Sequence, residues 1–263
     1  MSAPTIVVHV DLADALECRA EVAAKLAREW NCRITAVCAT GLVHLGPSLS
    51  PGQATDTYRA AVAAMQHFGE LMVRHGIAAV CRHLSNTNAA TALARAAQGA
   101  SLVIMSHHTN GATPPGHLDL CEFVVLNTPC PILIVGTQAQ FGSNVIIAYD
   151  GSNAAFHALT QARPFLEPAQ RVTLATFGPS RTASPAALDN AIDYLKSVGI
   201  APMVCCDNGV DDVGRRLAAL ARNRHADMVV MGGSAHPRWR NVLRGGTTGF
   251  MLEHTDIALL MSH

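Results

Sequence analysis

Two clusters of glycine near the C-terminus have the residue types and spacing of a phosphate-binding loop. An apolar run at 226–231 ends in Gly232 and Gly233, and a second cluster, Gly245–Thr247, opens a segment that reads as a helix. A strand followed by a glycine turn and a glycine-rich helix start presents backbone N–H groups and a helix dipole to an anion. Arginines at 238, 240 and 244 lie between the clusters, and each could contact phosphate or be solvated.

The elements that must position these residues alternate between strands and helices throughout the chain. Strands separated by helices predict parallel sheets covered on both faces. The predicted strands are Thr5–Val10, Arg33–Cys38, Ile77–His83, Ser101–Met105, Pro131–Val135, Asn144–Tyr149, Arg171–Phe177, Met203–Cys206, Asp227–Met231 and Ile257–Met261. The predicted helices are Ala13–Trp30, Thr55–His75, Asn88–Gln98, a short one near Leu118–Leu126, Asn153–Phe165, Pro185–Val198, Asp211–Asn223 and Gly246–Glu253.

The two halves of the chain repeat each other. Residues 100–105 parallel 226–231 at an offset of 126, and residues 128–135 parallel 255–262 at an offset of 127. Asp11 parallels Asp150 at the larger offset of 139, because the first half carries a longer connection after its second strand. A stable offset after one loop insertion is typical of a duplicated unit. We therefore predict two domains, 1–137 and 143–263.

The second half resembles the universal stress protein family, and two copies in one chain resemble its tandem members. The residues that carry this resemblance are 144–152, NVIIAYDGS, and the glycine loop. It implies an α/β fold of two Rossmann-like, adenine nucleotide alpha hydrolase-like domains, each an open five-stranded parallel sheet with helices on both faces. ATP-binding members carry the pattern G-x2-G-x9-G-[ST], which falls here on Gly232, Ala235, Gly245 and Gly246, followed by Thr247. Ala235 and Gly246 depart from it, and the added methyl of Ala235 loosens the approach to phosphate.

A ligand in such a fold is expected where the strand order reverses, beyond the carboxyl ends of the strands. We expect ATP or a related adenine nucleotide, with Mg²⁺, in the second half. Asp150 would face the ribose or the metal ion; the same Asp-Gly-Ser sequence also suits an ordinary turn and helix N-cap. The expected adenine-lining residues are Ala148, Phe177 and Met231, and the expected phosphate-binding residues are Gly232, Ala235, Gly245, Gly246 and Thr247.

The first half lacks the glycines of this predicted phosphate-binding loop. Asp119 and Leu120 stand where Gly245 and Gly246 would align, and a carboxylate at that turn repels phosphate. We predict a degenerate site there, with Asp11 capping the following helix. Histidines at 107, 108 and 117 show no metal-ligand spacing, so no metal site is predicted.

Composition narrows the class of protein. Lys plus Arg and Asp plus Glu number 19 each, so no net field favours nucleic acid or an anionic membrane. Eight cysteines without a CxxC pair indicate reduced thiols and a cytoplasmic protein. We expect no signal peptide and no membrane span.

Three functions remain open on the sequence. The first is a nucleotide-binding regulatory protein with slow or no hydrolysis, since no general base stands beside the glycine loop. The second is an interaction scaffold that has lost the site. The third, an ATP-dependent adenylating enzyme, would need a loop of the type SGGxDS where Tyr149–Asn153 stands. If the terminal strands of the two halves pair, the chain is an intramolecular pseudo-dimer that could dimerise further.

Overall fold

The structure, a computed structural model, describes residues 3–11, 15–40, 51–84, 87–107, 120–136, 138–178, 184–209, 212–233 and 246–263. The chain divides into two compact units. Unit 1 comprises residues 1–106 and 127–139, and unit 2 comprises residues 107–126 and 140–263. Residues 107–126 therefore belong by their contacts to unit 2, whereas the repeat pattern counts them in the first half. The predicted functional division at 1–137 and 143–263 stays a prediction.

Unit 1 contains a five-stranded parallel sheet in the order β3-β2-β1-β4-β5. Its strands are β1 (Thr5–His9), β2 (Arg33–Ala39), β3 (Ala79–Leu84), β4 (Leu102–Ser106) and β5 (Ile132–Val135). Its helices are α1 (Leu16–Glu29), α2 (Pro51–Arg74) and α3 (Ala89–Ala96). The central strands β1 and β4 are almost continuously apolar because both of their faces are buried, as parallel sheets require.

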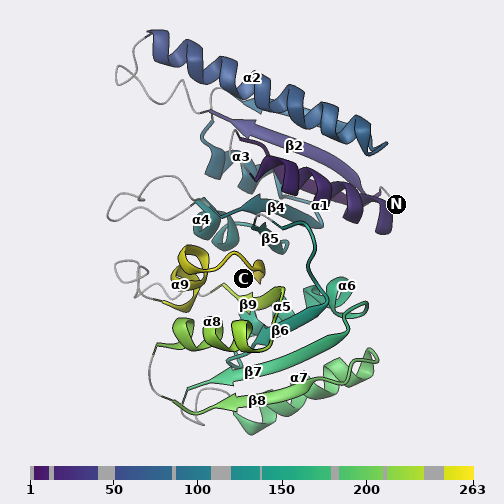
Figure 1. The fold of residues 1–263 in the computed structure, drawn as a ribbon, viewed down its shortest axis with the longest axis vertical. Helices are drawn as coiled ribbons and strands as arrows, with labels where there is room; N and C mark the ends of the chain where they lie inside the picture. Colours follow the sequence, from purple (N-terminus) through teal and green to yellow (C-terminus); the bar gives the residue numbers. More distant parts are fainter. Residues whose placement is uncertain are drawn as a thin grey trace. The chain divides into compact units, whose positions relative to one another are not determined.

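Unit 2 repeats this order as β10-β9-β6-β7-β8, again with parallel pairing (Figure 1). Its strands are β6 (Asn144–Ala148), β7 (Arg171–Phe177), β8 (Met203–Asp207), β9 (Met228–Gly232) and β10 (Ala258–Ser262). Its helices are α4 (Leu120–Leu126), α5 (Asn153–Gln161), α6 (Arg163–Leu166), α7 (Pro185–Ser197), α8 (Val213–Asn223) and α9 (Thr247–His254). The predicted α/β class with two five-stranded parallel sheets is confirmed.

One predicted helix of unit 2 is divided in two. The sequence predicts a single helix over residues 153–165, but α5 ends at Gln161 and α6 begins at Arg163. Pro164 has no N–H to donate to the carbonyl of Thr160, so the helix cannot continue through it. The Tyr194 hydroxyl of α7 donates to that carbonyl at 3.4 Å instead.

The register of unit 2 determines which side chains share a face of its sheet. Ala148 of β6 pairs with Ala175 of β7 and with Met231 of β9, so these three side chains lie on one face. Phe177 lies two residues beyond Ala175 and shares that face, which α8 covers through Arg216. Gly232 points to the opposite face, where it meets α5. Helices thus cover both faces, as expected.

No helix within the described ranges is long and apolar enough to cross a membrane.

Candidate functional site

The order of strands in unit 2 reverses between β6 and β9. The chain passes from β6 outward to β7 on one side and later returns to β9 on the other. In open α/β sheets, such a reversal of strand order is typical of the place where ligands bind, beyond the carboxyl ends of the strands. Asp150 follows β6, and Gly232 ends β9.

The three residues expected to line an adenine pocket lie on one face beside this reversal. Ala148 is half-buried, whereas Met231 is 4% exposed and Phe177 is 8% exposed. A base that used all three side chains would therefore have to displace whatever covers Met231 and Phe177.

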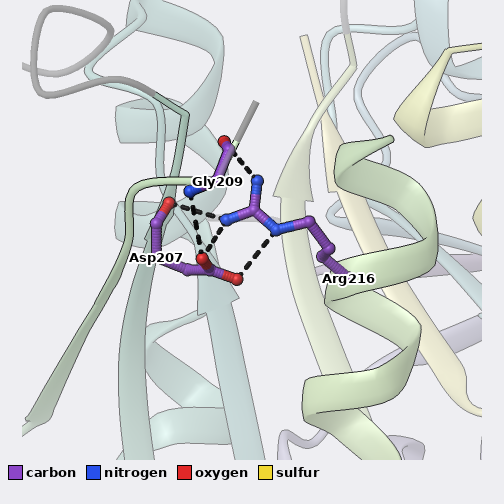
Figure 2. Close-up of polar contacts among 3 residues, drawn as sticks. All are labelled: Asp207, Gly209 and Arg216. Carbon is purple, nitrogen blue, oxygen red and sulfur yellow. Dashed lines mark hydrogen bonds and ion pairs between the residues drawn. The ribbon is translucent and has the colours of Figure 1, made fainter. Parts of the chain in front are cut away.

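The guanidinium of Arg216 is one of the groups that cover Phe177. Its Cζ lies 5.6 Å from the centroid of the Phe177 ring, within the range of a cation–π contact. Asp207, the last residue of β8, pairs with this guanidinium, and Arg216 Nε donates to Asp207 Oδ2 at 2.8 Å. Arg216 also donates to the backbone carbonyls of Asp207 and Gly209 (Figure 2).

The loop after β8 is shaped to this arginine. A Cβ at Gly209 would lie 2.8 Å from the Arg216 Cζ, so a larger residue there would push the flexible end of this side chain aside. The hydrogen bond from Arg216, the N–H of Gly209 and the positive charge together hold the pKa of Asp207 below its ordinary value, although burial opposes them. Sequence reasoning missed this cluster because no local motif pairs residues nine positions apart across a loop.

Asp150 forms the turn that the sequence allowed as the simpler alternative. Its Oδ1 accepts a hydrogen bond from the Ser152 N–H at 2.9 Å, and Ser152 is the N-cap of α5, with its Oγ 3.1 Å from Ala155 N. Asp150 is nevertheless exposed, and within the described ranges it forms no ion pair. Within the described residues only its Oδ1 accepts a hydrogen bond, which leaves Oδ2 for a ligand.

The equivalent aspartate of unit 1 is neutralised internally. Asp11 pairs with Arg19 of α1, which is 1% exposed, and lies 3.5 Å from His9 Nδ1. The prediction that Asp11 caps the following helix is wrong, since Ala15 is the N-cap of α1 and has no side-chain cap bond. At the offset of 139 residues, Arg19 corresponds to the buried Ala158, so Asp150 has no equivalent arginine among the described residues of unit 2.

Gly232 and Gly233 serve packing. A Cβ at Gly232 would lie 2.6 Å from Ala155 N, so glycine lets the first turn of α5 approach the end of β9. A Cβ at Gly233 would lie 2.4 Å from Val125 Cγ1 of α4. The N–H of Gly233 donates to the Ser262 carbonyl at 2.7 Å and is thus not free for a phosphate.

The N-terminus of α9 lies at the second glycine cluster, whose predicted role in binding phosphate stays a prediction. Gly246 is the N-cap of α9, and a Cβ there would meet nothing within 4 Å. Glycine supplies no side chain to the N–H groups of the first turn, and the Thr247 hydroxyl stands at its start. Ala235 and Gly245, which the sequence also assigns to the phosphates, lie outside the described residues.

Helix α9 is held in place by α8 and by residue 107. A Cβ at Gly214 of α8 would lie 2.7 Å from Phe250 Cβ, so the two helices pack closely there. His107, which is buried, donates from Nδ1 to the Leu252 carbonyl at 2.9 Å. His107 therefore has a structural role; histidines 108 and 117 lie outside the described residues.

Comparison with known proteins identifies the class of fold. A universal stress protein from Archaeoglobus fulgidus DSM 4304 matches 98% of this chain over 95% of its own, with a TM-score of 0.75 at 15% identity. A proposed universal stress protein from Pseudomonas aeruginosa UCBPP-PA14 matches 99% of this chain over 93% of its own, with a TM-score of 0.65 at 15% identity. The chain has the fold of these proteins. An A. fulgidus universal stress protein solved with dAMP covers 51% of the chain, with a TM-score of 0.39 at 13% identity. No family model and no curated protein matches the sequence.

Proposed function

We propose that the chain is a tandem universal stress protein that binds ATP or a related adenine nucleotide in unit 2 and acts as a regulatory protein. The observation that carries the proposal is the difference between the two equivalent aspartates. Asp11 of unit 1 is paired with a buried arginine, whereas Asp150 of unit 2 is exposed beside the reversal of strand order.

Different residues of this site suit different parts of a nucleotide. Ribose hydroxyls can donate hydrogen bonds to Oδ2 of Asp150, and Mg²⁺ prefers carboxylate oxygens of this kind. The first-turn N–H groups of α9 and the Thr247 hydroxyl suit phosphate oxygens, because the positive end of the helix dipole lies there. We expect hydrolysis to be slow or absent. The proposed location is the cytoplasm, where the eight free thiols stay reduced.

A scaffold that no longer binds nucleotide is the second candidate. The burial of Phe177 and Met231 favours it, because an open adenine pocket would leave both side chains more exposed.

Direct identification of a bound molecule separates the two candidates. The protein is purified gently and denatured, and released small molecules are identified by mass spectrometry; Mg-ATP is then titrated calorimetrically into the empty protein. About one adenine nucleotide per chain, or saturable binding of Mg-ATP, supports the proposal. An empty protein that ignores Mg-ATP refutes it and leaves the scaffold.

Asp150→Asn tests the assignment of the site. We expect it to weaken nucleotide binding about tenfold or more, since hydrogen bonds to a charged group contribute about 1.5–3 kcal/mol. Asp189→Asn is the matched control, because Asp189 is an exposed acid on α7 of the same unit. Equal affinities of the two variants would place the nucleotide elsewhere.

A further inference from the structure

A cavity of unit 2 lies at the edge of its sheet opposite the proposed nucleotide site. Its volume is about 140 Å³, and residues at the starts of β6, β7 and β8 line it. Asn144, Arg171 and Met203, the first residues of the three strands, line it. Ala148 ends β6 at the other edge, roughly 13 Å away for a five-residue strand. This cavity is therefore separate from the proposed nucleotide site.

The floor of the cavity is apolar with one hydroxyl. Ile146 and Thr173 pair in register and lie on the same face, and Met203 pairs with Thr173 on the other side. Ile146 and Thr173 are 1% and 5% exposed, whereas Met203 is 48% exposed. A partly open Met203 beside a buried floor leaves apolar area that a ligand can cover.

Two arginines, Arg171 and Arg224, line the cavity. Neither forms an ion pair with a described residue, in contrast with Arg163, Arg215 and Arg216 of the same unit, which all pair with acids. Arg224 Nη1 lies 2.8 Å from the Met203 sulfur, which is only a weak acceptor.

Negative charge near the cavity limits the charge of a ligand. Helix α8 ends at Asn223, so the negative end of its dipole lies beside Arg224. The carboxylate of Asp227 follows the lining residue Ala226 and accepts hydrogen bonds from the N–H groups of residues 142–144. Two guanidiniums against this one carboxylate leave about one positive charge for a ligand to balance.

We propose that this cavity binds a small monocarboxylate with an apolar body about the size of benzene. A cavity of roughly 150 Å³ lined by apolar side chains accommodates benzene. The planar carboxylate suits the fork of a guanidinium, and the ring would cover Ile146 and Met203. Thr173 and Asn144, whose Nδ2 already donates to the His225 carbonyl at 3.2 Å, add polar groups at the wall.

The test uses benzoate as the probe and the intact protein with labelled methionine and isoleucine methyl groups. Methyl NMR should show saturable shifts at Met203 and Ile146, with a Kd on the order of 1 mM for so small a ligand. The neutral isostere benzamide should bind at least about tenfold more weakly, because it lacks the charge that the arginines recognise. The same titration with Mg-ATP present should give the same Kd, so the result does not depend on the nucleotide site.

Variants locate the charge recognition. Arg171→Gln and Arg224→Gln should each weaken benzoate binding several-fold, and the double variant about tenfold or more. Arg222→Gln is the matched control, because Arg222 is exposed on the last turn of α8 and does not line the cavity. Both lining arginines are exposed, so the single variants should fold normally.

Four outcomes would overturn the proposal. Benzamide could bind as tightly as benzoate, or Arg222→Gln could weaken binding as much as the lining variants do. Benzoate could leave the Met203 and Ile146 methyl signals unmoved. Phenyl phosphate could bind more tightly than benzoate, which would indicate that the cavity prefers a phosphate ester to a carboxylate.

Discussion

Gly232 and Gly246 belong to the same glycine motif, yet their surroundings predict opposite responses to alanine. At Gly232 the new Cβ would lie 2.6 Å from Ala155 N and 2.8 Å from Ala154 C. Both neighbours are backbone atoms, so neither can swing aside as a flexible side chain would. At Gly246 the new Cβ would meet nothing within 4 Å, and the φ of −80° suits alanine.

The expected cost of Gly232→Ala follows from this crowding. Overpacking costs about 1–3 kcal/mol. The shift also strains the N-cap bond from Ala155 N to Ser152, and losing such a cap costs about 0.5–2 kcal/mol. We expect unit 2 to lose about 2–3 kcal/mol, which lowers its Tm by roughly 4–12 °C at about 2–4 °C per kcal/mol. Gly246→Ala should cost at most about 1 kcal/mol, because it meets no steric clash and only replaces glycine by the less favourable alanine at the N-cap of α9.

Urea and thermal denaturation of the ligand-free protein, followed by circular dichroism, measure both variants. The probe must resolve unit 2, because two units need not unfold in one step. If Gly232→Ala were as stable as the parent, the close approach of α5 to β9 would not be what requires glycine. Equal destabilisation by Gly246→Ala would contradict the finding that a Cβ there meets no described atom within 4 Å.

Three further predictions test other parts of the structure. Arg216→Ala should raise the pKa of Asp207 toward its ordinary value, as an NMR titration would show, and an unchanged pKa would contradict the pairing. Because the folded pKa of Asp207 is depressed, the pair's contribution to the stability of unit 2 is complete above about pH 4 and is lost as the pH falls. This contribution is under about 1 kcal/mol, because the carboxylate is so exposed. Gly214→Ala should destabilise unit 2 by about 1–3 kcal/mol, because its new Cβ would lie 2.7 Å from Phe250 Cβ. Phe250→Gly, which removes that Cβ, should relieve most of the added cost in a double-mutant cycle, and strictly additive effects would mean that the two residues do not meet. Burial raises the pKa values of Cys38 and Cys130 to about 11. A thiol reagent at pH 8 should therefore label the exposed Cys81 and Cys206 of the native protein well before these two buried cysteines, as peptide mass spectrometry will show. Equal labelling rates would refute the burial of Cys38 and Cys130.

The strand-and-helix alternation was readable from the sequence because apolar runs of strand length and helical segments alternate throughout it. The repeat also predicted which aspartates correspond, since insertions in one connection leave the later offsets nearly constant. The composition of each strand carries this information locally, so the α/β class needed no knowledge of distant contacts. The break at Ala162 was equally local, through Pro164, although the sequence prediction overlooked it.

Which side chains meet was decided by the tertiary structure. Asp11 and Asp150 look alike along the chain, but a buried Arg19 neutralises the first and the alanine at the corresponding position leaves the second exposed. Gly232 looks like a phosphate-binding glycine, yet the approach of α5 is what demands it. Sequence spacing predicts residue types and periodicity, whereas steric room and charge neutralisation depend on which helix packs against which strand.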